Sequence, residues 1–175
     1  MIYYNDGIVL IRELREADAE YFAAEECAQG WESSPERYQI RLKDSAEGRC
    51  VALAAEYDGT PAGNINLYFE TTGGPFRDKG YPVIVDFGVL EKFRRRGIGK
   101  RLMDMAEAIA SERSDTVCLA VGLYDGYGAA QRIYAKRGYV PDGSGIWYGD
   151  HPAWAYDESY PIDDDLVMWM SKKLR

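Results

Sequence analysis

The residues best suited to chemistry lie together in one turn, Arg94-Arg95-Arg96-Gly97-Ile98-Gly99, between an apolar segment and an amphipathic one. Glycine lacks the Cβ atom that would keep a ligand away from the backbone. The first peptide N–H groups of a helix have no partner within that helix, and the helix dipole makes this end partly positive. Such a turn suits a pyrophosphate, and the neighbouring arginines can neutralise further phosphate charge.

Basic residues are concentrated at this turn although the chain as a whole is acidic. The net charge of the 175 residues is −8, yet six Lys and Arg residues fall between Lys92 and Arg101. Residues 138–171 contain no Lys or Arg, and their carboxylates are Asp142, Asp150, Asp157, Glu158, Asp163, Asp164 and Asp165. This separation indicates two ligands of opposite charge, unless the acidic stretch is only a solvated surface. The negative net charge argues against nucleic acid as a partner.

Two common phosphate-binding motifs do not fit the turn. A Walker A loop requires Ser or Thr after its lysine, but Arg101 follows Lys100. A dinucleotide fingerprint requires a third glycine where this chain has Leu102. The turn therefore binds phosphate in some other way, or is a basic helix start with incidental glycines.

Composition predicts one globular domain, residues 1–175. The hydrophobic content is 46%, and no apolar run approaches the roughly 20 residues that cross a membrane. The N-terminus lacks a signal-peptide pattern, so we expect a cytoplasmic protein without a membrane partner. Cys27, Cys50 and Cys118 are predicted to be reduced and buried. With one histidine and no CxxC pair, no metal site is expected.

Hydrophobic periodicity predicts the elements that must position the turn. Ser34 and Pro35 mark a helix start, Asp58–Gly59 a hairpin turn and Gly138 a helix end. The predicted strands are 8–12, 50–57, 62–70, 83–90, 116–123, 145–148 and 165–171, and the predicted helices are 15–31, 33–48, 98–110 and 128–137. This order predicts a mixed α/β fold whose partly antiparallel sheet is flanked by helices. Strand, glycine turn and helix meet at residues 85–107, where a ligand is expected.

The turn resembles the acetyl-CoA signature [RQ]-x-x-G-x-[GA] of the GNAT (Gcn5-related) N-acetyltransferases, and it matches every fixed position. The resemblance extends over nearly the whole chain. Residues 83–93 look like the family's fourth strand, and residues 128–140 look like its second signature, carried by Ala130, Tyr134, Gly138 and Tyr139. Two positions depart from the pattern, because Tyr127 replaces a common Asn and Glu91 a common Pro. The resemblance implies the family's mixed sheet, with a splayed strand pair at the acetyl-CoA site.

The resemblance also implies which residues bind acetyl-CoA. The pantetheine arm is expected to pair with the backbone near Phe87–Val89, and the N–H near Val89 to polarise the thioester carbonyl. The predicted cofactor-binding residues are Phe87, Gly88, Val89, Arg94, Arg95, Arg96, Gly97, Ile98, Gly99, Lys100, Tyr127 and Ala130. The departure at Tyr127 leaves open whether its side chain contacts the cofactor arm.

Acetyl transfer further needs an acid for the leaving thiolate and a base for the acceptor ammonium. Tyr134 occupies the family's general-acid position, although a tyrosine on this apolar helix face could serve packing alone. The candidate bases are Asp86, on the strand that leads to the turn, and Glu70, at the end of the preceding hairpin. Either carboxylate could instead be a surface or ion-paired group, with water as the base.

The acceptor is predicted to be a small cationic amine. The stretch Trp147–Trp169 is rich in carboxylates and aromatic rings and lacks basic residues, which favours charge pairing and cation–π contact. Polyamines, aminoglycosides, amino-acid derivatives and lysine side chains all meet this description. The same aromatic residues would also suit a homodimer contact. The predicted function is acetyl-CoA-dependent N-acetylation of a primary amine, and the alternative is a non-catalytic regulatory module that binds CoA or acyl-CoA.

Overall fold

The computed structural model describes residues 1–153 and 159–175, which form two compact units. The first unit contains Met1–Tyr68 and Val85–Ile109, and the second contains Phe69–Ile84 and Ala110–Arg175. Strand pairing is mostly antiparallel and helices flank the strands, so the predicted mixed α/β fold is confirmed. The chain crosses between the units inside strand β5 (Val83–Val89) and helix α3 (Ile98–Ser111).

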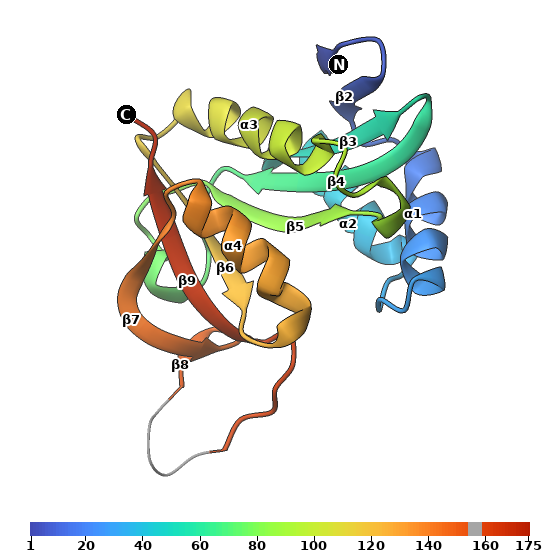
Figure 1. The fold of residues 1–175 in the computed structure, drawn as a ribbon. Helices are drawn as coiled ribbons and strands as arrows, with labels where there is room; N and C mark the ends of the chain where they lie inside the picture. Colours follow the sequence, from blue (N-terminus) through green and yellow to red (C-terminus); the bar gives the residue numbers. More distant parts are fainter. Residues whose placement is uncertain (154–158) are drawn as a thin grey trace. The chain divides into compact units, whose positions relative to one another are not determined.

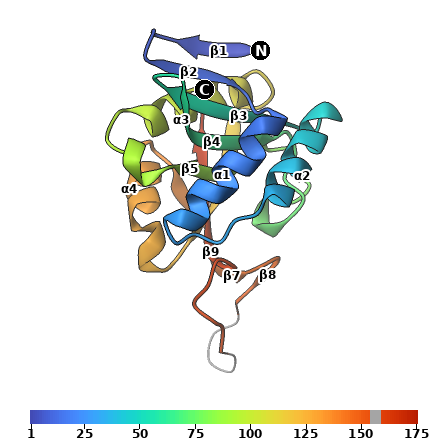
Figure 2. The same ribbon diagram turned by 90° about the vertical axis from the view of Figure 1, so that its right-hand side faces the viewer.

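Successive antiparallel strands build the first unit. They are β1 (Ile2–Asn5), β2 (Val9–Glu13), β3 (Cys50–Tyr57) and β4 (Thr60–Tyr68), followed by β5. The β3–β4 turn is the predicted one, because Asp58 and Gly59 both have positive φ (49° and 74°), as a tight hairpin turn requires. Figure 2 shows helices α1 (Glu16–Ala28) and α2 (Pro35–Ala46) in front of these strands, with α3 behind them.

The core under α1 and α2 is apolar and aromatic. Phe22 of α1 stacks on Tyr38 of α2 with ring centroids 5.6 Å apart, and both pack on Ala52 and Ala54 of β3. Helix α2 begins at Pro35 with Ser34 as the N-cap residue, as predicted. This packing fixes the two helices against the strands that lead to β5.

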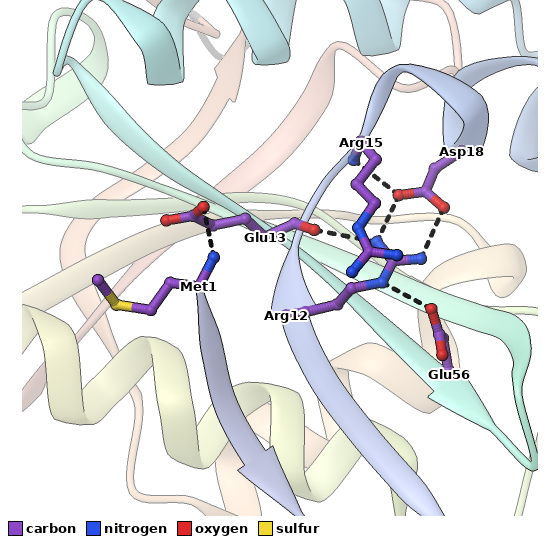
Figure 3. Close-up of polar contacts among 6 residues, drawn as sticks. All are labelled: Met1, Arg12, Glu13, Arg15, Asp18 and Glu56. Carbon is purple, nitrogen blue, oxygen red and sulfur yellow. Dashed lines mark hydrogen bonds and ion pairs between the residues drawn. The ribbon is translucent and has the colours of Figure 1, made fainter.

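A buried ion cluster joins β2, β3 and α1 (Figure 3). The Arg12 guanidinium donates to both Asp18 oxygens at 2.6 and 2.9 Å and to Glu56 at 2.6 Å. Asp18 also accepts the Arg15 backbone N–H at 2.7 Å, which caps the start of α1. The Asp18 carboxylate therefore pairs with the buried Arg12 guanidinium and also caps the start of α1.

The second unit is built around strand β6 (Thr116–Gly122). Val83 and Ile84 of β5 pair with β6 in parallel, and β9 (Leu166–Lys173) pairs with it in antiparallel orientation. Strand β7 (Val140–Tyr148) pairs with β9 and with the short β8 (His151–Pro152). Helix α4 (Gly128–Lys136) lies over β6 and β9 in Figure 1 and ends, as predicted, next to Gly138 at φ 88°.

Several details differ from the sequence prediction. Strands β1 and β8 were not predicted. Strand β7 begins at Val140 instead of Gly145, and a bulge between Pro141 and Ile146 interrupts its pairing with β9. All three cysteines are free, but Cys27 is exposed, so its predicted burial is wrong. Burial raises the pKa of both Cys50 and Cys118 to about 11. Among the described residues, no helix has the length and apolar character needed to cross a membrane.

Candidate active site

The glycine turn forms a backbone concavity at the start of α3. Arg95 (φ 62°) and Gly97 (φ 77°) both adopt the left-handed conformation, which turns neighbouring N–H groups toward one side of the chain. The first helical hydrogen bond is donated by the Arg101 N–H to the Gly97 carbonyl at 3.1 Å. Across the ranges that the structure describes, the N–H groups of residues 97–100 donate no hydrogen bond. These free donors at a helix N-terminus suit an anionic ligand.

The geometry of the turn requires a glycine at position 97 and favours one at position 99. Gly97 has a φ that side chains rarely tolerate, and a Cβ atom there would lie 2.6 Å from the Arg101 guanidinium. A Cβ atom on Gly99 would lie 3.1 Å from the Phe87 ring. The turn therefore keeps its backbone bare while α3 approaches β5 closely. A diphosphate fits this cradle, and Ile98, whose side chain is buried, would contribute only its N–H group.

Most basic side chains around the turn already have partners within the first unit. Arg94 pairs with Glu91 and Lys100 with Asp104, both at 3.0 Å. Arg101 donates to Asp6 and Tyr4, and Lys92 pairs with Glu25. Arg96 lies over the Tyr57 ring at 4.6 Å without a carboxylate partner. Of this basic group, Arg95 is the exposed residue for which the described part of the chain supplies no partner.

Replacing Arg95 with alanine is expected to weaken CoA binding about tenfold, because a charge-assisted contact to phosphate is lost. The loss should shrink at high salt, where exposed charges are screened. Calorimetric titration with CoA at low and high salt measures both effects. Lys43→Ala on α2 removes one exposed positive charge elsewhere in the same unit and should leave binding unchanged. Equal losses in the two variants would contradict a specific role for Arg95.

Strand β5 approaches β4 closely where the acyl group is expected. A Cβ atom on Gly63 would lie 2.6 Å from the Gly88 carbonyl oxygen, so β4 needs a glycine at this point. Beyond it, the Leu90 N–H donates to the Ala62 carbonyl at 2.9 Å. The segment Phe87–Val89 is therefore fixed by the main chain of its neighbour.

Asp86 is held in an ion-pair network. Its φ is 50°, which is uncommon for a residue with a side chain and is maintained here by its contacts. Its two oxygens accept from Arg37 at 3.0 Å and Arg41 at 2.7 Å, and Asn66 donates at 3.3 Å. Both oxygens of this predicted base are thus engaged by cationic donors.

Glu70 and Tyr134 belong to the second unit. Glu70 lines an open depression of about 630 Å³, together with Thr71, Thr72, Arg77, Asp78 and Gly80. Tyr134 lies on α4, is 6% exposed, and its ring is 5.7 Å from that of Tyr139. Burial raises the pKa of Tyr134, so its hydroxyl remains protonated at neutral pH.

Tyr127 and Ala130 lie where the chain enters α4. Ala130 is half-buried in the first turn, and Tyr127 packs so closely on Gly122 that a Cβ atom there would lie 2.4 Å from the ring. The hydroxyls of Tyr124 and Tyr127 both donate to Asp164, at 2.7 and 3.0 Å. Where the family pattern has Asn, this chain has a tyrosine hydroxyl bonded to the acidic stretch.

The acidic stretch is organised by tyrosines. Tyr148 donates to Asp163 at 2.9 Å and lies near Tyr160 and His151, with ring centroids 5.2 and 6.3 Å away. Asp163 and Asp164 of this stretch thus accept from phenols. Two other predicted members, Asp157 and Glu158, fall outside the described residues.

Sequence reasoning missed Glu26, a buried carboxylate in the first unit. Glu26 is 3% exposed, and its Oε1 atom lies 4.0 Å from the position of a Cβ atom on Gly88. The available signal was its spacing from Phe22, which places an acidic residue on the buried face of α1.

Comparison with known proteins gives a consistent result. Residues 11–139 match the family model described as the acetyltransferase (GNAT) family. None of the curated proteins matches the sequence. Among solved structures, a Salmonella typhimurium acetyl transferase that modifies the N-terminal serine of ribosomal protein L7/L12 is 12% identical, with a TM-score of 0.71 and 99% of each chain covered.

Two further structures share the fold. Ard1 from Thermoplasma volcanium is 21% identical, with a TM-score of 0.69 over 95% of this chain and 97% of that one. The yncA protein of Salmonella typhimurium, whose structure includes its cofactor acetyl-CoA, is 13% identical, with a TM-score of 0.66 over 97% and 95%.

Proposed function

The chain belongs to the acetyltransferase (GNAT) family, and from this premise we propose that it moves an acetyl group from acetyl-CoA to a primary amine by direct attack. Residues 1–175 act as a single domain in this proposal, and the acceptor is a small cationic amine. The observation that carries the proposal is the bare backbone of residues 95–99, with left-handed residues at Arg95 and Gly97 and free N–H groups at the start of α3.

Each assigned residue has one task. The N–H groups of Gly97–Lys100 hold the diphosphate, and Arg95 and Arg96 neutralise its charge. When bound, acetyl-CoA supplies the acetyl group as an activated thioester. The backbone of Phe87–Val89 positions that end of the site, and the N–H near Val89 polarises the carbonyl oxygen. The Tyr134 hydroxyl, kept protonated by burial, donates the proton that the leaving sulfur takes up.

The acceptor class is supported by the tyrosine-bound carboxylates of the second unit, which attract cations. A protein N-terminus is the second candidate, because a structural neighbour modifies the N-terminal serine of a ribosomal protein. Both acceptors present an amine that must lose a proton before it can attack, with a pKa of roughly 10.4 for a lysine-type amine and roughly 8 for an α-amine.

Thiol release from acetyl-CoA with a panel of amines tests this function. The panel contains spermidine, kanamycin, Nα-acetyl-lysine and a peptide that begins with serine. We expect turnover with at least one cationic small amine, faster than with the peptide. Turnover with the peptide alone would replace the small acceptor with a protein. Binding of acetyl-CoA without turnover of any amine would favour the regulatory CoA-binding module instead.

A further inference from the structure

A buried carboxylate faces the strand on which the acetyl group is expected. Glu26 lies in the last turn of α1, and its Oε2 atom accepts a hydrogen bond from the Ser33 hydroxyl at 2.5 Å. Its Oε1 atom lies 4.0 Å from the position that a Cβ atom on Gly88 would take. A buried carboxylate is costly unless it is paired or has a function, and within the ranges that the structure describes no Lys or Arg nitrogen lies within 4 Å of the Glu26 carboxylate.

Gly88 leaves room between this carboxylate and the strand. The Trp31 ring borders the same space, with its Cζ3 atom 3.5 Å from the Gly88 Cβ position. The Trp31 backbone N–H donates to the Glu26 backbone carbonyl at 2.9 Å, and the Arg94 guanidinium lies 5.5 Å from the centre of the Trp31 ring. Arg94 belongs to the diphosphate turn, so a residue of the predicted cofactor loop lies over the ring that borders this space.

The other charged groups near Glu26 come from α2. The Arg37 guanidinium interacts electrostatically with both Asp86 and Glu26. Burial, the largest cause, and the Glu26 carboxylate raise the pKa of Tyr38, whose hydroxyl also accepts from Asn64 at 3.3 Å. The Tyr38 hydroxyl and the Arg37 guanidinium are thus the groups of α2 that interact with Glu26. Strand β5 contributes Gly88 beside Glu26, and its Asp86 carboxylate interacts with both Arg37 and Tyr38.

Glu26 differs in this respect from both carboxylates predicted from the sequence. Asp86 has each oxygen bonded to an arginine, so an ammonium would have to compete with two guanidinium groups for it. Glu70 is exposed and lines an open depression. Glu26 accepts a hydrogen bond from the Ser33 hydroxyl, has the Tyr38 hydroxyl as a further neighbour, and lies against Gly88 in the unit that also carries the diphosphate turn.

We propose that Glu26 accepts the proton of the acceptor ammonium and that Glu26, Trp31 and Gly88 form the acceptor end of the acetyl site. This inference rests on the proposed function. Two protons leave the nitrogen as the N–C bond forms and the C–S bond breaks. Glu26 takes the first and passes it to water, and the second ends on the leaving sulfur. The Trp31 ring offers the ammonium a cation–π contact before it is deprotonated.

The test measures kcat/KM against pH for wild type, Glu26→Gln and Glu32→Gln, with the fastest acceptor of the amine panel. Glutamine can still accept from Ser33, so the fold should be preserved. Glu26→Gln should lower kcat/KM about 100-fold at pH 7. The difference in kcat/KM between wild type and Glu26→Gln should become smaller as the pH approaches the pKa of the amine, because the free amine then needs no base. Glu32 is exposed on the same segment, and its variant should match wild type.

Gly88→Ala tests the same space from the strand side. Its added methyl group would lie at ordinary contact distance, 3.5 Å from Trp31 and 4.0 Å from Glu26, so the protein should fold. We expect the KM for the amine to rise by a larger factor than the Kd for acetyl-CoA, which calorimetry measures. The role of Glu26 would be overturned if the Glu26→Gln variant had the kcat/KM of wild type. It would also be overturned if kcat/KM were reduced by the same factor at every pH. Wild-type protein that turns over no amine would instead refute the proposed function.

Discussion

Replacing Tyr134 with phenylalanine is expected to lower turnover about 1,000-fold, within the range for loss of a general acid, while the affinity for acetyl-CoA stays unchanged. The substitution removes one hydroxyl from a side chain that is buried on α4, and it leaves the ring packing against Tyr139. Without the phenol, the sulfur must leave as an unprotonated thiolate. The raised pKa of Tyr134 also has a consequence for the wild type, because its hydroxyl should ionise at a higher pH than an ordinary tyrosine, and any loss of activity through this ionisation should be shifted to higher pH.

The measurement is steady-state thiol release together with calorimetric binding of acetyl-CoA. Tyr139→Phe is the matched control, because it makes the same change in the neighbouring buried ring. Its turnover should remain close to that of wild type. If Tyr134→Phe turned over as fast as wild type, Tyr134 would be a packing residue and the proton would come from elsewhere.

Replacing Asp18 with alanine is expected to lower the free energy of unfolding by about 3–5 kcal/mol, as for removal of one partner from a buried ion pair. The side chains of Arg12 and Asp18 are each 4% exposed, so the variant would leave the guanidinium buried beside Glu56 alone. It would also remove the acceptor for the Arg15 N–H at the start of α1 (Figure 3). Both losses act on the unit that carries the diphosphate turn.

Urea denaturation of wild type, Asp18→Ala and Glu13→Gln measures this effect. Glu13 pairs with the N-terminal amine in an exposed position, and its loss should cost less than about 1 kcal/mol. A similar small loss for Asp18→Ala would show that the buried cluster contributes little net stability.

Local patterns predicted the elements that position the site. The Ser34–Pro35 helix start, the Asp58–Gly59 turn and the glycine turn before α3 each depend on residues adjacent in sequence. Periodicity could not find β1, a four-residue edge strand with exposed ends. It also missed the start of β7, because Gly143 and Gly145 have positive φ inside a bulged strand and resemble a loop.

The charges of the site required the tertiary structure. The arginine cluster suggested several free cations, but Arg101 finds Asp6 at a separation of 95 residues, and only the fold shows this. Strand alternation could not place Asp86, because its positive φ interrupts the alternation before Gly88. The sequence also could not identify Glu26 as a site residue, because it lies beside Gly88 in the fold but far from it in the sequence.

The central claim is that the bare backbone after the arginine triplet holds the diphosphate of acetyl-CoA. A crystal structure of the protein with acetyl-CoA tests it most directly. The account predicts that diphosphate oxygens lie within hydrogen-bonding distance of the N–H groups of Gly97–Lys100, with the Arg95 side chain beside them. A diphosphate bound elsewhere on the protein, with these N–H groups facing only water, would contradict it.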